Sequence, residues 1–331
     1  MSEPARPRGH LSGGLMFPGQ GTQRIGMGRW MERSSRAASA VFDVAAEVLG
    51  RDVRALCFNG PARQLTLTQH AQVAVFTCNA AAAALLDAEG FGAELAVGHS
   101  VGELNALVAA GVLTLEDGLR LVAARGELMG RITAPGAMSA IIGLEPDAVR
   151  GLCDAASDGS GTVVPALLNG PHNVVVSGDV AAVERCEALA PDAGARKVAR
   201  LVVSSAFHSP LMAEAVAEWS GVVAAAPLTQ PRIPVVLNTT GAVATGVDDV
   251  ATALVDQLTG PVRWVEDVRA AVAAGARTLV EAGDSKVLTA LVRAIDPDLP
   301  TMTMHDPKML RRLRGETPAT QPRPQLARAS S

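Results

Sequence analysis

The sequence predicts an α/β fold: a large domain with a mostly parallel sheet, and a smaller subdomain inserted into it. Short apolar runs alternate with segments of helical periodicity along most of the chain, which is typical of a parallel sheet covered by helices. Residues 135–204 depart from this alternation, because their expected order of β-α-β-β-α-β is that of a split ferredoxin-like unit. Hydrophobic residues make up 48% of the 331 positions, enough to bury a sizeable core.

The predicted domain boundaries follow from changes in composition. The large domain is expected over residues 14–134 and 205–310, with the ferredoxin-like subdomain at 135–204. Residues 1–13 are rich in Arg, Pro and Gly, and residues 315–331 are rich in Pro, Gln, Arg and Ser. Segments of this composition bury too little apolar surface to fold, so we expect a disordered leader and a disordered tail.

The elements before the insert are predicted from apolar runs, helical spacing and turn residues. They are a strand at 15–17, helices at 30–49 and 70–89, a strand at 95–97, and helices at 101–110 and 114–131. The stretch 71–86 is the most apolar of the chain, but Gln72, Thr77 and Asn79 interrupt it. It therefore indicates a buried helix rather than a membrane span.

The insert and the returning chain are divided in the same way. In the insert we expect strands at 137–144, 163–168, 174–177 and 197–203, and helices at 146–156 and 180–190. The returning chain predicts a helix containing Met212 and Trp219, a strand at 233–238, a helix at 248–258, a helix ending at Ala274, a strand at 278–281, a helix at 286–295 and a strand near Met302.

Charge and cysteine content exclude several classes of function. The formal net charge is −4, and no basic stripe with interleaved aromatic residues is present, so nucleic-acid binding is not expected. The N-terminal residues lack the apolar centre of a signal peptide. The four cysteines are widely spaced and form no CxxC pair, which is typical of reduced thiols in a cytoplasmic protein. Neither a metal site nor membrane association is predicted.

The stretch Gly98-His99-Ser100-Val101-Gly102 has the pattern GxSxG between a predicted strand and a predicted helix. This is the arrangement of a nucleophile elbow, in which a serine stands at the apex of a sharp turn. The helix that follows would direct free backbone N–H groups toward the serine, where they could stabilise an oxyanion. A tight strand–helix turn without chemistry is the alternative. The side chain of His99 is expected to point away from the active face.

Arg125 lies in the middle of the apolar face of the helix predicted at 114–131. An unpaired buried charge is prohibitively costly, so its guanidinium must find an anion. Spacing leaves two candidates equally open, namely a structural carboxylate and the carboxylate of a ligand. Extension of the side chain to water is less favourable so near the helix middle.

Together, seven short segments resemble those of the malonyl-CoA:acyl carrier protein transacylases, which include free-standing enzymes of fatty acid synthesis and acyltransferase domains of polyketide synthases. The segments occur in family order and cover about residues 15–305. They are Phe17-Pro18-Gly19-Gln20-Gly21, Gly98-His99-Ser100-Val101-Gly102-Glu103, Arg125-Gly126, Gly136-Ala137-Met138, Asn169-Gly170-Pro171, Ala206-Phe207-His208-Ser209 and Pro261-Val262-Arg263-Trp264.

This resemblance implies an α/β-hydrolase-like large domain carrying a ferredoxin-like subdomain. It also implies that Ser100 is the nucleophile and His208 its general base, with the backbone N–H groups of Gln20 and Val101 forming the oxyanion hole. Gln257 matches the position whose backbone carbonyl orients the histidine. The implied reaction is ping-pong acyl transfer through an acyl-serine, which requires no metal or other cofactor.

The resemblance further implies that Arg125 binds the free carboxylate of a malonyl group. Phe207 matches the malonyl-type form of its motif, and Asn169 matches a position lining the cleft near the histidine. The expected substrate is malonyl-CoA, and the expected partner is an acyl carrier protein bearing phosphopantetheine. The enzyme itself is expected to be a monomer.

Two alternative functions remain open from the sequence. One is a trans-acting polyketide synthase acyltransferase that loads a different acyl group. The other is a thioesterase or hydrolase on a similar fold, although such an enzyme needs no buried cation at Arg125. The segment Glu281–Lys286 lacks the Gly-Pro that usually precedes the lysine in the resembling family, and Gln69-His70-Ala71 replaces its usual Gln-Pro-Ala. These departures leave the expected chemistry unchanged.

Overall fold

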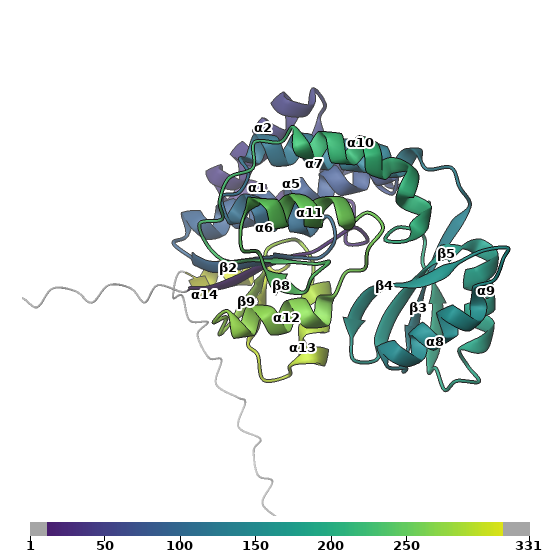
Figure 1. The fold of residues 1–331 in the computed structure, drawn as a ribbon. Helices are drawn as coiled ribbons and strands as arrows, with labels where there is room; N and C mark the ends of the chain where they lie inside the picture. Colours follow the sequence, from purple (N-terminus) through teal and green to yellow (C-terminus); the bar gives the residue numbers. More distant parts are fainter. Residues whose placement is uncertain (1–11, 314–331) are drawn as a thin grey trace, which may run out of the picture.

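The computed structural model describes residues 12–313, which form two sheets of different character (Figure 1). The larger sheet has the order β10-β9-β1-β2-β7-β8, and the smaller has the order β4-β5-β3-β6. The large-sheet strands are β1 (Ser12–Phe17), β2 (Gly92–Gly98), β7 (Val235–Leu237), β8 (Ala242–Val243), β9 (Leu279–Glu281) and β10 (Thr301–Thr303). The small-sheet strands are β3 (Gly136–Ile142), β4 (Val163–Gly170), β5 (Asn173–Asp179) and β6 (Lys197–Arg200).

All strand pairs of the large sheet are parallel except β7 with β8. Helices cover both of its faces, with α12 and α13 on one side and the larger helical layer on the other (Figure 1). The helices of the large domain are α1 (Arg29–Ser34), α2 (Arg36–Leu49), α3 (Val53–Asn59), α4 (Ala62–Leu65), α5 (Thr68–Ala88), α6 (Gly102–Ala109), α7 (Leu115–Arg131), α10 (Ala213–Ala224), α11 (Val247–Asp256), α12 (Trp264–Ala273), α13 (Val287–Ile295) and α14 (Lys308–Leu313), and a 3₁₀ turn spans Pro210–Met212.

The small sheet is antiparallel, and α8 (Pro146–Ala156) and α9 (Val180–Leu189) pack on one of its faces. In chain order its elements are β3-α8-β4-β5-α9-β6, which is the split ferredoxin-like order predicted above. The mostly parallel sheet with this inserted unit confirms the predicted fold class. Figure 1 shows the small sheet and its helices to one side of the large domain.

The main differences from the sequence predictions concern five elements. Strand β1 begins at Ser12, so residues 12 and 13 are not part of a disordered leader as predicted. Backbone pairing requires no apolar side chain, and Ser12 and Gly13 pair with Gly92 and Ala93. The helices α3 and α4, on either side of Gly60-Pro61, and the elements β8 and α14 were not predicted, because each is short. Residues 1–11 and 314–331 lie outside the described part of the chain.

The apolar helix α5 is the buried helix that the sequence predicted. Among the described residues it is the one helix whose length and composition would suffice to cross a membrane, but most of it is buried within the protein. Its three polar interruptions are themselves buried and hydrogen-bonded: Gln72 contacts Arg125, Thr77 bonds to the carbonyl of Val73, and Asn79 donates to the carbonyl of Pro18. A core helix satisfies these groups, as membrane lipid would not.

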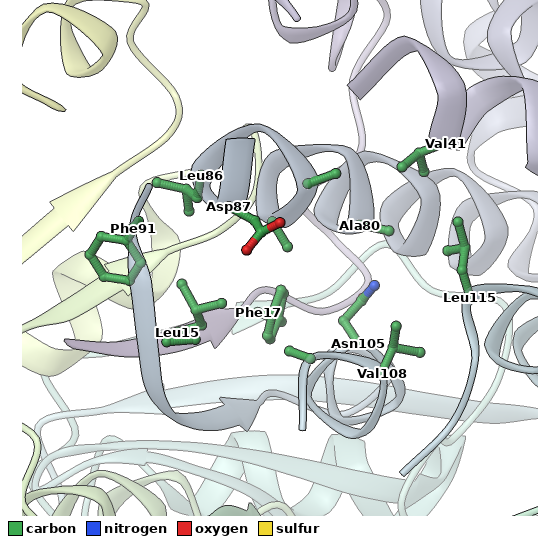
Figure 2. Close-up of a pocket in the computed structure, with 14 residues that line it drawn as sticks. Leu15, Phe17, Val41, Ala80, Leu86, Asp87, Phe91, Asn105, Val108 and Leu115 are labelled. Carbon is green, nitrogen blue, oxygen red and sulfur yellow. The ribbon is translucent and has the colours of Figure 1, made fainter. Parts of the chain in front are cut away.

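A cavity of about 340 Å³ lies between α5, α6 and the strands β1 and β2 (Figure 2). Its lining is mainly apolar and includes Leu15, Phe17 and Phe91. Asn105 also lines it, and the Asn105 amide is occupied by hydrogen bonds to Phe76 and Asn79. This cavity shares no lining residue with the one that contains Ser100, described below.

The two domains are joined directly by backbone hydrogen bonds. Leu168 of β4 donates to the carbonyl of Val262, and Val262 donates to the carbonyl of Ala166, both at 2.8 Å. Val262 lies two residues before the start of α12 of the large domain. The ferredoxin-like unit is therefore fixed to the large domain beside the first turn of α12.

The start of α6 packs against the end of β1 so closely that only glycine fits at Gly102. A Cβ atom there would lie 2.1 Å from the carbonyl oxygen of Phe17. Since that oxygen belongs to the backbone, it cannot move aside as a flexible side chain could. We predict that Gly102→Ala lowers the free energy of unfolding by about 1–3 kcal/mol, the usual cost of overpacking.

Urea denaturation followed by circular dichroism measures this change, and Gly151→Ala is the matched control. Gly151 lies within α8, where an added Cβ would meet nothing within 4 Å. That substitution should stabilise the protein by about 0.5–1 kcal/mol, because alanine loses less conformational entropy in a helix. Equal effects of the two substitutions would contradict the close packing at Gly102.

Candidate active site

The candidate site lies where neighbouring parallel strands end at the same edge of the large sheet. Gln20 follows β1, Ser100 follows β2, and Asn238 follows β7. The carboxyl ends of parallel strands are the usual location of ligand sites in α/β proteins. The topology therefore collects residues that are more than 200 positions apart in sequence.

Ser100 stands at a sharp turn between β2 and α6, with a backbone φ of 54°. This left-handed conformation costs a non-glycine residue roughly 1–2 kcal/mol. The flanking glycines are required by space, since a Cβ on Gly98 would lie 2.1 Å from the carbonyl carbon of Gly102. The local geometry is therefore that of the nucleophile elbow predicted from the sequence.

His208 contacts the serine hydroxyl directly. The distance from Ser100 Oγ to His208 Nε2 is 2.7 Å. The other ring nitrogen, Nδ1, faces the carbonyl oxygens of Gln257 at 2.9 Å and Gly260 at 3.2 Å. Because both carbonyls only accept, Nδ1 must carry the proton, which leaves Nε2 free to accept the hydrogen bond from the serine.

Burial keeps the His208 imidazole neutral. Its side chain is 3% exposed, and loss of solvation lowers the pKa of His208 to about 3. The nearby positive charge of Arg125 and the neighbouring His99 lower the pKa further, and the two carbonyl partners of Nδ1 oppose the shift. At neutral pH the ring is therefore a proton acceptor, as a general base must be.

Arg125 is fully buried in α7, and its guanidinium points toward the serine. Its Nη2 atom donates to Gln257 Oε1 at 2.8 Å and lies 3.4 Å from Ser100 Oγ, while Nη1 donates to Gln72 Oε1 at 2.9 Å. Of the two anions that the sequence left open, a structural carboxylate makes no direct contact, because the direct partners among the described residues are neutral amides and a hydroxyl. The carboxyl of Glu103 acts on Arg125 only from a greater distance. Burial lowers the pKa of Arg125 to about 10, so the side chain remains charged at neutral pH.

Two backbone amides border the serine. Val101 begins the turn into α6, and Gln20 lies in the loop after β1. Within residues 12–313, neither N–H group donates to a protein acceptor. Both are therefore available to a ligand oxygen placed beside Ser100 Oγ.

A cavity of about 400 Å³ opens over Ser100 and His208. Its walls come from both domains and are mainly apolar; among the lining residues are Gln20, Gln72, Met129, Met138, Leu201 and Phe207. His99 also lines this cavity, so the prediction that its side chain points away from the active face is wrong. The His99 ring packs near Trp264, and its Nε2 atom lies 2.8 Å from Asn169 Oδ1. Asn169 thus contacts the site through His99, rather than through His208.

Sequence reasoning missed the buried polar residues that surround the predicted ones. Gln72 holds Arg125, and Asn238 accepts a hydrogen bond from the backbone N–H of Ser100 at 2.8 Å. Glu103 and Asp267 are buried beside Asn238. The only signals in the sequence were the polar interruption at Gln72 and the position of Glu103 directly after the GxSxG pattern.

Burial raises the pKa values of both carboxyl groups. The pKa of Glu103 rises to about 7, and that of Asp267 lies well above its usual range. Proximity to Glu103 adds to the upward shift of the Asp267 pKa.

Among residues 12–313, no group of three or more His, Cys, Asp or Glu residues is placed to bind a metal ion.

The chain is similar to known proteins over most of its length. The family model described as "Acyl transferase domain" matches residues 15–316. The malonyl CoA-acyl carrier protein transacylase of Bacillus subtilis is 37% identical over 298 residues, which cover 89% of this chain and 94% of the relative. The crystal structure of malonyl-CoA:acyl carrier protein transacylase from Xanthomonas oryzae pv. oryzae has a TM-score of 0.87 at 37% identity, over 94% of this chain and 99% of that one.

A second solved structure is a complex of a type II polyketide synthase acyl-carrier protein with its malonyl-transacylase. The matched chain has a TM-score of 0.88 at 33% identity, over 92% of this chain and 99% of its own length. Both coverages are high, so the similarity extends over the two domains and the cavity between them.

The lowered pKa of His208 predicts a pH dependence of stability. Between about pH 3 and pH 6.5 the unfolded chain binds a proton at this position and the native protein does not. The free energy of unfolding contributed by His208 should therefore rise with pH in this window, by at most about 1.4 kcal/mol per pH unit, and level off above it.

Urea denaturation of the wild type and of His208→Gln across this window isolates the contribution. The difference cancels the opposing effects of Glu103 and Asp267, whose raised pKa values are common to both proteins. A difference that does not vary with pH would show that His208 titrates alike in the native and unfolded states.

Proposed function

The chain belongs to the acyl transferase family, and from this premise we propose that it transfers a malonyl group from CoA to an acyl carrier protein. The choice of substrate rests on Arg125. This cation is buried next to the serine hydroxyl, and the direct partners of its guanidinium are uncharged. A buried guanidinium gains most from a carboxylate, which it binds through two parallel hydrogen bonds. Malonyl thioesters carry a free carboxylate at the required end, and acetyl thioesters do not.

We propose a ping-pong reaction in two similar halves. In the first, Ser100 Oγ attacks the thioester carbonyl of malonyl-CoA while His208 Nε2 takes the hydroxyl proton. The backbone N–H groups of Gln20 and Val101 stabilise the tetrahedral oxyanion. The C–S bond then breaks, the CoA sulfur receives the proton from His208, and a malonyl-serine remains.

In the second half the phosphopantetheine thiol of the carrier protein gives its proton to His208 and attacks the malonyl-serine. The collapse of this second oxyanion breaks the bond to Ser100 Oγ, which recovers the proton from His208. All proton transfers use one histidine that is held by two backbone carbonyls. The reaction therefore needs no metal or redox cofactor.

The remaining parts of the proposal concern selectivity, partners and location. Phe207 lines the cavity next to His208, where its bulk would crowd a branch at the acyl α-carbon. The acyl carrier protein named with the solved relative supports a carrier protein as the acceptor here. The four cysteines are free and buried, which is consistent with a reducing cytoplasm. We propose that the enzyme acts there as a monomer.

The first test of this function concerns Ser100. Incubation with malonyl-CoA should give a malonyl adduct on the wild type and none on Ser100→Ala, because the substitution removes the attacking oxygen. Mass spectrometry of the intact protein measures the adduct. A normal yield on Ser100→Ala would exclude Ser100 as the nucleophile. Rapid release of free malonate without benefit from carrier protein would instead indicate a hydrolase.

The second test concerns Arg125. Arg125→Ala should cost malonyl transfer about 2–5 kcal/mol, the range for removing one side of a buried charge pair. Acetyl transfer should change much less, since it lacks the carboxylate. Acylation rates with malonyl-, methylmalonyl- and acetyl-CoA measure the selectivity, and their ratio does not depend on the fraction of folded protein.

Arg120→Ala is the matched control for this substitution. Arg120 lies on the same helix but is exposed and pairs with Asp117. Its removal should leave the malonyl-to-acetyl ratio unchanged. If Arg125→Ala leaves that ratio unchanged as well, Arg125 is a structural residue, and an acyltransferase for a different acyl group becomes the better hypothesis.

A further inference from the structure

The side chain of Asn238 spans the turn that presents the nucleophile. Its Oδ1 atom accepts from the backbone N–H of Ser100 at 2.8 Å, and its Nδ2 atom donates to the carbonyl of Gly98 at 2.6 Å. The two contacts lie on the N-terminal side of the apex and span the residue between them, His99. Because one partner only donates and the other only accepts, a single orientation of the amide satisfies both.

Asn238 is itself held firmly. It follows β7 and is fully buried, and its backbone N–H donates to Glu103 Oε2 at 2.6 Å. The Nδ2 atom makes a second bond to Asp267 Oδ2 at 2.9 Å, and Gln257 Nε2 approaches Oδ1 at 3.3 Å. Every polar atom of the Asn238 amide is thereby used.

The turn needs such a support. A non-glycine residue at φ 54° persists only where the surrounding structure determines its conformation. The glycines at 98 and 102 make room for the turn, but they do not favour it over other backbone conformations. Among the described residues, Asn238 is the side chain that binds the backbone at both Gly98 and Ser100, the two residues that flank His99.

We propose that Asn238 is a positioning residue that holds Ser100 in its strained, reactive conformation by bridging Gly98 and Ser100. The inference rests on the proposed acyl transfer through Ser100. Asn238 does not line the cavity, so it would act through the serine backbone rather than by contact with substrate. It would therefore affect the rate of acylation and leave the concentration of malonyl-CoA needed for half-saturation unchanged.

Asn238→Asp tests this with little change of shape. The substitution keeps the acceptor for Ser100 but places an oxygen where Nδ2 now donates to Gly98 and Asp267. We expect the acylation rate constant to fall about 10²-fold, the effect of a displacement of about 1 Å at a reacting group. Protonation of the introduced carboxyl would restore a donor, so the ratio of variant to wild-type rates should rise as the pH is lowered.

A second substitution guards against a general folding defect. In the double variant Asn238→Asp with Asp267→Asn, the amide introduced at 267 can donate to the carboxylate introduced at 238. The rate is expressed per folded molecule, with the folded fraction measured by circular dichroism, and part of the lost rate should return. Asp267→Asn alone keeps an oxygen that accepts from Asn238, and it should remain close to wild type.

Asn105→Asp is the matched control. Asn105 is also buried, and its Nδ2 atom also donates to a backbone carbonyl, that of Phe76, but it makes no contact with the turn. Asn105→Asp should lower the stability of the protein. Its acylation rate per folded molecule should stay near the wild-type value, with the folded fraction measured by circular dichroism. Equal acylation by Asn238→Asp and Asn105→Asp, at all pH values, would overturn the proposal.

Reaction with a fluorophosphonate probe separates this inference from the proposed function. The probe modifies an activated serine without requiring a malonyl group. If the wild type reacts with the probe but not with malonyl-CoA, the substrate proposal fails and the role of Asn238 is still measurable. If Asn238→Asp reacts with the probe as fast as the wild type, the positioning role is refuted whatever the substrate.

Discussion

Gly98 and Gly102 approach the surrounding backbone so closely that neither position has room for a Cβ atom, and the location of Ser100 follows from this contact. The tight packing lets β2 end and α6 begin within three residues, beside the end of β1. It brings the Val101 amide and the loop containing Gln20 to the same place. The nucleophile and the amides next to it are thus set by the packing of backbone on backbone, which flexible side chains could not achieve with equal accuracy.

A cation buried under this turn imposes the second constraint. Arg125 cannot reach water, and its amide partners reduce the cost of burial without neutralising its charge. The same charge lowers the pKa of His208 and so helps to keep it unprotonated. The carboxyl of Glu103 raises the pKa of Arg125. Charge, base and nucleophile therefore form one coupled electrostatic unit within a few ångströms. This explains why the polar residues around it are almost all buried and hydrogen-bonded.

The features that could be predicted from the sequence are those encoded locally. Alternating strands and helices, the insert and the GxSxG turn each lie within a short window, and their pattern is visible in it. The apolar face around Arg125 was visible in the same way, but its partners were not, because Gln72 lies on α5 and Gln257 directly follows α11. Asn238 was missed for the same reason: an asparagine after a short strand has no distinctive local pattern. The predicted orientation of the His99 side chain was wrong, because this orientation depends on Asn169, a residue of the inserted subdomain.

The backbone bridge between Val262 and the strand β4 has a mechanical consequence. Val262 is two residues from Gly260, whose carbonyl faces the His208 ring, so the inserted subdomain and the histidine share one short stretch of chain. The contact between His99 and Asn169 provides a second tie on the other side of the serine. A swinging motion of the subdomain would break both ties and misalign the base. The cleft should therefore keep nearly the same width in both halves of the proposed reaction, because widening it would break these contacts.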